Sequence, residues 1–280
     1  MHPVYVHIKK DLSPFYAEEE ASAMAKWISS DILHLSTLEL YIGKDMNFST
    51  KEWEELEDIL RRLKQREPLQ YILQEASFCG RSFHVEQGVL IPRPETEELV
   101  EWIVADYREA GQVRILDIGT GSGCIPVSLA QLLPEAQVSS CDVSAEALRI
   151  AAMNVKRYGD KVTLFCADIL KEELPECQVD VLVSNPPYIT ESERTDMEAN
   201  VLDWEPELAL FVPDSDPLRF YRRIARKGLD WLSEGGALYF EINRAYGAET
   251  VRMLEALGYR QIELRKDLSG NDRMIKAIRP

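Results

Sequence analysis

The sequence predicts an α/β fold, a mostly parallel sheet with helices on both faces, preceded by a small helical bundle. From residue 113 onward, apolar runs of strand length alternate with segments of helical periodicity, which is typical of parallel sheets. The first 66 residues instead repeat apolar positions at helical spacing. We therefore divide the chain into a helical bundle over 1–74, a β-hairpin linker over 75–93 and a main domain over 94–280.

The composition narrows the class of protein. The 280 residues are 45% hydrophobic and 29% charged, as in soluble globular proteins. The formal net charge of −16 repels a phosphate backbone, so direct binding to nucleic acid is not expected. No apolar stretch has the length of a membrane span or a signal peptide, which predicts a cytoplasmic protein. Five cysteines without C-x-x-C spacing predict reduced, mostly buried thiols and no metal site.

The N-terminal region contains start signals for two helices. Ser13, followed by Pro14 and a run of acidic residues, predicts an N-cap. The stretch from Ser49 to Glu52 is a capping box, and Pro68 ends the helix that it opens. One face of that helix consists of Leu56, Ile59, Leu60 and Leu63.

The remaining elements follow in order. Residues 76–91 alternate apolar and polar positions around Gly80 and Gly88, which predicts a hairpin, and a helix begins near Pro94. Seven strands come next, separated mainly by helices. The first five lie at 113–119, 136–143, 162–168, 179–185 and 236–242, and two more follow Gly258.

A glycine-rich loop, "DIGTGSG", joins the first of these strands to a helix. Glycines permit a tight turn and let a ligand approach the backbone. A dinucleotide-binding loop needs glycine or alanine at position 124, where this chain has Cys124. The loop fits S-adenosylmethionine-dependent methyltransferases better. The residues predicted to bind this cofactor here are Gly119, Thr120, Gly121, Ser122 and Gly123.

Acidic residues follow the next two strands. Asp142 can accept hydrogen bonds from both hydroxyls of a ribose, and Asp168 could face an adenine ring. Each aspartate could instead cap the helix that follows it, and the two roles are compatible. The carboxyl ends of parallel strands share one edge of the sheet, where ligands bind in this architecture. We therefore expect both side chains beside the glycine loop.

The fourth strand ends in Asn185-Pro186-Pro187-Tyr188. The prolines cannot continue a sheet interior, and they push Asn185 and Pro186 away from helical geometry. The side-chain carbonyl of Asn185 and the backbone carbonyl of Pro186 can then accept both protons of a planar NH2 group, against the face of Tyr188. We predict Asn185, Pro186 and Tyr188 as catalytic and all four residues as substrate-binding. The alternative is a rigid turn with a packed tyrosine.

Seven ordered motifs extend from about Glu67 to the end of the chain. They are "REPLQYIL", "FCGRSFHV", "VLIPRPETEELV", "DIGTGSGCIPVSLA", "VSNPPYI", "WEPELAL" and "KDLSGNDRM". Together they resemble the release factor glutamine N5-methyltransferases, the PrmC/HemK family. The helical N-terminal region is compatible with this resemblance.

The resemblance implies a class I S-adenosylmethionine-dependent methyltransferase fold, a Rossmann-like seven-stranded sheet. It implies methylation of the glutamine side-chain amide (N5) in the Gly-Gly-Gln motif of class 1 peptide chain release factors. Our own hypothesis is that the helical bundle recognises the body of the release factor. Its cofactor residues would include Asn185, and Arg93, Pro94 and Glu95 would help to close the pocket. Ile169 stands where some relatives have tryptophan, so we expect only an apolar cofactor contact there.

Two further departures from the family pattern follow the fifth strand. Asn243 and Tyr246 stand where glycine and glutamine are common. Three other functions fit the sequence less well. A DNA or RNA methyltransferase acting on adenine N6 or cytosine N4 would need a basic groove, and the net charge of −16 opposes it. A non-catalytic binding protein would have lost the glycines or the proline tip. A nicotinamide-dependent oxidoreductase is disfavoured by Cys124 and by histidines that all precede the sheet.

Overall fold

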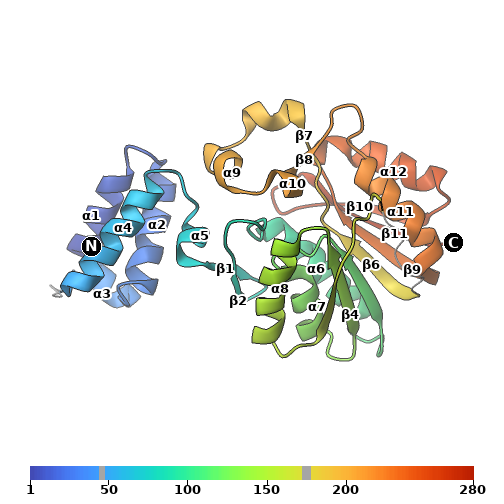
Figure 1. Cartoon of the computed structure of the whole chain (residues 1–280), viewed down its shortest axis with the longest axis horizontal. Coiled ribbons are helices and arrows are strands. Elements are labelled where there is room, and N and C mark those ends of the chain that lie inside the picture. Colours follow the sequence, from blue (N-terminus) through green and yellow to red (C-terminus); the bar gives the residue numbers. More distant parts are fainter. Residues whose placement is uncertain (44–47, 172–177) are drawn as a thin grey trace. The chain divides into compact units, whose positions relative to one another are not determined.

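The computed structural model describes residues 1–43, 48–171 and 178–280, so Cys177 lies outside the described residues. The chain forms two compact units (Figure 1). The first, called the helical unit, consists of Met1–Leu73 with Ala199–Trp204. The second, called the sheet unit, consists of Gln74–Glu198 with Glu205–Pro280.

The helical unit is built from short amphipathic helices whose apolar faces meet. Helix α4 opens with the predicted capping box: Ser49 Oγ accepts a bond from the Glu52 N–H at 3.3 Å, and Glu52 Oε2 accepts one from the Ser49 N–H at 2.6 Å. The predicted face of α4 is buried, which confirms that prediction. The helices of the unit are α1 (Pro3–Leu12), α2 (Glu18–Asp31), α3 (Thr37–Ile42), α4 (Thr50–Leu63), α5 (Leu69–Leu73) and α9 (Ala199–Trp204).

The prediction of an N-cap at Ser13 was wrong. Helix α1 already begins at Pro3, and Ser13 follows its last residue, where the Ser13 hydroxyl donates to the Lys10 carbonyl at 2.9 Å. Proline suits the first position of a helix, because its missing N–H would have had no partner within the helix there. The cap of α1 is His2, whose Nδ1 accepts a bond from the Val4 N–H at 3.2 Å.

The sheet unit contains a seven-stranded sheet with the spatial order β10-β11-β9-β6-β3-β4-β5. Neighbours from β9 to β5 pair in parallel, whereas β11 is antiparallel to both β9 and β10. This confirms the predicted seven strands and the mostly parallel sheet. The strands are β3 (Arg114–Ile118), β4 (Gln137–Asp142), β5 (Val162–Cys166), β6 (Val179–Ser184), β9 (Leu232–Glu241), β10 (Arg260–Lys266) and β11 (Asp272–Ile278).

Other elements of this unit surround the sheet. The predicted hairpin is an antiparallel pair, β1 (Glu75–Phe78) and β2 (Arg81–His84), and the predicted helix at Pro94 is α6 (Pro94–Tyr107). The other helices are α7 (Cys124–Leu132), α8 (Ala145–Arg157), α10 (Glu207–Leu210), α11 (Arg219–Trp231) and α12 (Gly247–Ala256). Two 3-10 turns, η1 (Glu191–Asp196) and η2 (Arg244–Tyr246), and a short parallel pair, β7 (Ile189–Thr190) with β8 (Phe211–Val212), complete it.

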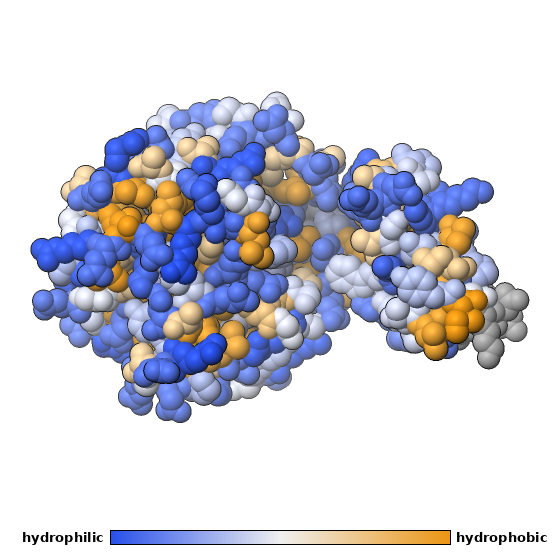
Figure 2. All heavy atoms as spheres, turned by 180° about the vertical axis from the view of Figure 1, so that it is seen from behind, coloured by the Kyte–Doolittle hydropathy of each residue, from blue (hydrophilic) through white to orange (hydrophobic). Residues whose placement is uncertain are grey.

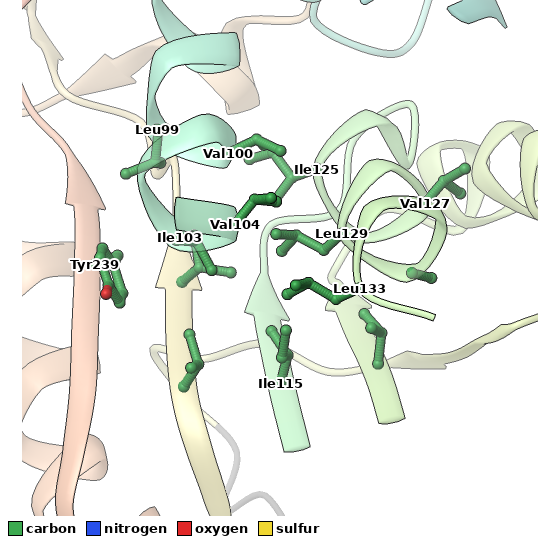
Figure 3. Packing of buried hydrophobic residues seen from close by; sticks show 14 of the residues in the cluster. Leu99, Val100, Ile103, Val104, Ile115, Ile125, Val127, Leu129, Leu133 and Tyr239 are labelled. Carbon is green, nitrogen blue, oxygen red and sulfur yellow. The ribbon is translucent and has the colours of Figure 1, made fainter. Parts of the chain in front are cut away.

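Two apolar cores hold the sheet between its helices. On one face, apolar side chains of α6 and α7 meet over β3, and Figure 3 shows Val100 of α6 beside Ile125 of α7. On the other face, Ile224 of α11 and Leu254 of α12 pack with Leu182 of β6. Covering both faces fixes the strands, so the loops that leave their carboxyl ends start from rigid positions.

The face shown in Figure 2 is mainly polar. Figure 2 shows hydrophilic residues over most of the visible face of each unit, with smaller apolar areas between them. Among the described residues, no helix is long and apolar enough to cross a bilayer.

The cysteines are buried to different degrees. Of the four described cysteines, Cys124 and Cys141 are buried, Cys79 is half-buried and Cys166 is exposed, so burial of the thiols is only partly confirmed.

Candidate functional site

A cavity of about 450 Å³ lies at the carboxyl edge of the parallel strands in the sheet unit. This volume falls within the range of small-molecule sites, about 300–1,000 Å³. Most predicted site residues line it, namely Gly119, Thr120, Gly121, Ser122, Asp142, Asp168, Ile169, Asn185, Pro186 and Pro187. Gly123 and Tyr188 do not line it. The structure therefore gathers at one place residues that come from four different strand ends.

The glycine loop turns from β3 into α7 with its backbone open to the cavity. The N–H groups of Gly119 and Thr120 both donate to the Cys141 carbonyl, at 2.8 and 3.1 Å, which ties the loop to β4. Gly121 has a φ of +52°, and a Cβ atom there would meet no protein atom within 4 Å. Gly123 is different, because a Cβ atom there would lie 3.3 Å from the Cβ of Ala151. Its φ of +83° and this close approach give Gly123 a packing role against α8.

The two predicted aspartates lie on the cavity wall and also cap the backbone. Asp142 accepts bonds from the N–H groups of Gly121 and Ser144 at 3.0 and 2.9 Å. Burial raises the pKa of Asp142, and these two N–H donors oppose the rise. Asp168 accepts a bond from the Leu170 N–H at 2.9 Å. A carboxylate oxygen has further acceptor capacity beyond one such bond, so capping leaves both side chains able to bind a ligand.

Asn185 faces the glycine loop from the end of β6. Its backbone carbonyl oxygen would lie 3.9 Å from a Cβ atom placed on Gly119. Its side-chain Nδ2 donates to Thr96 Oγ1 at 3.2 Å. The side-chain oxygen, Oδ1, has no hydrogen-bond partner among the described residues. Asn185 thus offers an oriented acceptor on the wall of the cavity.

Behind the proline tip lies a buried carboxylate that the sequence analysis missed. Glu241, at the end of β9, accepts bonds from Thr96 Oγ1 at 2.6 Å and from the Tyr188 hydroxyl at 3.0 Å. Glu241 is therefore connected to Tyr188 directly and to Asn185 through Thr96. An acidic residue at the end of a buried strand was the available signal, the same one that identified Asp142.

Of the three residues predicted to help close the pocket, Arg93 lines the cavity and the other two do not. Arg93 lines the cavity and pairs with the buried carboxylate of Glu205 at 2.5 Å, and the Ile91 N–H donates to that carboxylate at 3.1 Å. Pro94 and Glu95 form the first turn of α6 and do not line the cavity. Glu205 is a second residue that the sequence analysis did not single out.

One departure from the family pattern has a clear structural role. Asn243 Nδ2 donates to the Tyr188 carbonyl at 3.0 Å and to Glu193 Oε2 at 2.9 Å. Asn243 therefore holds the C-terminal end of the proline tip in place. Tyr246 precedes α12 as its N-cap and makes no side-chain capping bond.

Comparisons with known proteins place the chain in a family. Residues 7–73 match the PrmC N-terminal domain, and residues 96–203 match the methyltransferase small domain. A release factor glutamine methyltransferase of Bacteroides thetaiotaomicron is 50% identical over 280 residues, covering 100% of both chains. The chain belongs to the release factor glutamine methyltransferase family. The enzyme of the same name from Flavobacterium psychrophilum is 42% identical and covers 95% of this chain and 94% of that one.

The fold agrees with this family assignment. A methyltransferase of Pyrococcus furiosus, only 15% identical, aligns over 82% of this chain and 98% of its own with a TM-score of 0.51. The sheet unit of this family member thus has the class I methyltransferase fold, as predicted. Within the described residues, no group of three or more histidine, cysteine, aspartate or glutamate side chains could hold a metal ion.

Proposed function

We propose that this methyltransferase uses S-adenosylmethionine to methylate N5 of the glutamine side chain in the Gly-Gly-Gln motif of class 1 peptide chain release factors. The helical bundle over 1–74 would recognise the body of the release factor, the segment 75–93 would link the two parts, and the domain over 94–280 would transfer the methyl group. Because these substrates act in translation, we also propose a cytoplasmic location. The family to which the chain belongs supports this proposal.

The residues around the cavity fit the cofactor. Gly119 and Gly121 leave space on the cavity side of the loop that side chains would fill. The Asp142 carboxylate would accept the ribose hydroxyls, and Asp168 and Ile169 would lie against the adenine. The cavity wall is mainly apolar with a few polar groups, as small-molecule sites are. When bound, S-adenosylmethionine supplies a methyl group activated by the adjoining positive sulfur.

The single observation that supports an amide substrate is the orientation of Asn185. Its Nδ2 donates a hydrogen bond to Thr96, so Oδ1 is the side-chain atom that can accept an N–H from the substrate. Within the described residues, no hydrogen bond ends on the Pro186 carbonyl. Two acceptors on a stiff backbone suit a planar NH2 group with two protons.

An amide nitrogen is a poor nucleophile, because its lone pair is shared with its carbonyl. The two acceptors would offset this weakness by orienting the nitrogen. Asn185 Oδ1 would hold one amide proton and Pro186 O the other, which fixes the nitrogen in position. As the new C–N bond forms and the bond between the methyl carbon and the cofactor sulfur breaks, leaving a neutral thioether, the nitrogen becomes more acidic and would release one of these protons to water. The residues thus provide orientation and acceptor oxygens, and the reaction needs no histidine base.

Labelling of a purified release factor tests the proposed function. We expect methyl label from S-adenosylmethionine to enter the release factor, and peptide mass analysis to place one methyl group on the Gly-Gly-Gln glutamine. A release factor in which glutamate replaces this glutamine is the matched control and should take up no label. Label that persists in this control, or that enters tRNA or DNA supplied instead, would contradict the proposal.

Substitutions of two glycines test where the cofactor binds. Gly121 and Gly270 both have positive φ, +52° and +83°, and open space around a new Cβ atom. Alanine at either position should therefore strain the backbone by about 1 kcal/mol. Only Gly121→Ala should also weaken binding of S-adenosylmethionine, by tenfold or more in calorimetry, because only Gly121 lines the cavity. Equal affinities of the two variants would place the cofactor elsewhere.

A further inference from the structure

The carboxylate of Glu241 is buried behind the proline tip and points toward the hydroxyl groups of two other elements. Glu241 is 1% exposed. Its Oε2 lies 2.6 Å from Thr96 Oγ1 on α6, and its Oε1 lies 3.0 Å from the hydroxyl of Tyr188. Burying a carboxylate destabilises the folded state unless the charge is well partnered. The burial of Glu241 beside the proline tip therefore suggests a role at this site.

The chemistry of these groups fixes the direction of each hydrogen bond. An ionised carboxylate can only accept, so the Thr96 hydroxyl must donate its one proton to Glu241. The Thr96 oxygen is then an acceptor toward Asn185, 3.2 Å away. Asn185 must therefore present its NH2 group to Thr96, which leaves its Oδ1 on the other side. If the Thr96 hydroxyl could instead donate to Asn185, the side-chain amide of Asn185 could adopt the reverse orientation and present its NH2 group to the cavity.

The charges around Glu241 come from several elements. Burial raises the pKa of Glu241 and Glu95 on α6 adds to the rise, whereas Arg273 on β11 opposes it. Arg273 is itself paired with Asp267 at 3.1 Å. Burial also raises the pKa of Tyr188 and of Tyr221 on α11, so these two hydroxyl groups stay neutral. Burial therefore favours the protonated form of Glu241, so acidification removes the charge of this carboxylate more readily than that of an exposed glutamate.

We propose that Glu241 is a positioning residue that, through Thr96, holds the Asn185 amide in the one orientation that offers Oδ1 to the substrate. The same carboxylate fixes the Tyr188 hydroxyl, so a single group sets both ends of the tip. This inference rests on the proposed function, because it assumes that Asn185 Oδ1 accepts an N–H of the glutamine amide. An alternative role for Glu241 is to stabilise the fold without affecting the orientation of Asn185.

Two substitutions of Thr96 separate these roles kinetically. Thr96→Val keeps the shape of the side chain but removes the hydroxyl, and we expect kcat to fall by about tenfold or more while the dissociation constant of S-adenosylmethionine stays within about twofold of wild type. Thr96→Ser should restore kcat to near the wild-type value. Thr250→Val is the matched control, because its buried hydroxyl donates only to the Tyr246 carbonyl on α12, at 2.8 Å. A Thr96→Val variant with wild-type kcat would overturn the proposal.

A measurement that does not depend on catalysis tests the orientation itself. In protein labelled with 15N-asparagine, the Asn185 side-chain signal can be assigned by its loss in Asn185→Ala. We expect this signal to shift with acidic pH in wild type as Glu241 is protonated, and the shift to be absent in Glu241→Gln and in Thr96→Val. An unchanged titration in both variants would overturn the proposal. If the wild-type protein methylated no release factor while the titration behaved as expected, the proposed function alone would fail.

Discussion

Replacing Asn185 with alanine is expected to lower kcat for release factor methylation by about 10²-fold or more, which is the usual effect of removing a positioned polar group that acts in the transition state. The substitution deletes Oδ1, the acceptor proposed for the glutamine amide, together with the bond from Nδ2 to Thr96. The dissociation constant of S-adenosylmethionine should change far less than kcat, because the glycine loop and Asp142 remain. Initial rates at saturating cofactor and calorimetric titration measure the two quantities.

Asn271→Ala provides the matched control for this experiment. Asn271 lies between β10 and β11 and does not line the cavity, and its backbone N–H, not its side chain, bonds to Asp267 Oδ1 at 2.9 Å. We expect its kcat to equal that of wild type within about twofold. An Asn185→Ala variant that turned over as fast as this control would rule out the amide clamp.

Local sequence signals were sufficient to locate the seven strands of the large sheet and to predict that it is mostly parallel, but not to predict the order of its strands. Each strand of the parallel part contains a short apolar run, and the first four predicted strands lead into residues that line the cavity, such as Gly119, Asp142 or Asn185. These predictions succeeded because strand and helix periodicity depends on neighbours in sequence, and because alternating strands and helices favour a parallel sheet. The capping box at Ser49 was predictable for the same reason, since its two partners lie three residues apart.

The interactions behind the tip could not be predicted in this way. Glu241 and Thr96 are 145 residues apart in sequence, and Asn185 and Thr96 are 89 apart. No periodic pattern relates such positions, because their meeting depends on how α6 packs over the ends of β6 and β9. The motif that contains Thr96 was recognised, yet its resemblance directed attention to Arg93, Pro94 and Glu95 instead.

Two predicted ligand contacts, those of Gly123 with the cofactor and of Tyr188 with the substrate, are not tested by the structure. Both were predicted at the ligand, and neither lines the cavity. The positive φ of Gly123 and its approach to Ala151 account for a glycine there without a ligand. The Tyr188 hydroxyl is held by Glu241. Their contacts with cofactor and substrate stay predictions.

Asp117→Asn is expected to change how the stability of the sheet unit depends on pH, by about 2–3 kcal/mol between pH 5 and pH 8. Asp117 lies in β3 beneath the glycine loop and is 0% exposed. Its Oδ2 accepts a bond from Ser140 Oγ at 2.5 Å, and its Oδ1 has no hydrogen-bond partner among the described residues. Burial raises the pKa of Asp117 to about 7.

The sign of this effect follows from the raised pKa. The folded protein keeps the Asp117 proton more tightly than the unfolded chain, so this contribution to stability is fully present below the unfolded pKa of about 4 and is lost as the pH rises through about 7. Asparagine cannot ionise, so the Asp117→Asn variant should lack this loss. Urea-dependent hydrogen exchange of the β3 amides, measured near pH 5 and near pH 8, reports the free energy of unfolding at each pH.

Asp180→Asn is a control whose pH dependence should have the opposite sign. Asp180 lies on the neighbouring strand β6, and its bonds with Arg114 lower its pKa. Its contribution to stability is therefore present above the unfolded pKa and is lost as the pH falls through the lower folded pKa. Replacing it should cost stability at about pH 8, whereas Asp117→Asn should gain it there. If both variants followed the pH dependence of wild type, the buried charge at Asp117 would not determine the stability of this sheet in alkaline solution.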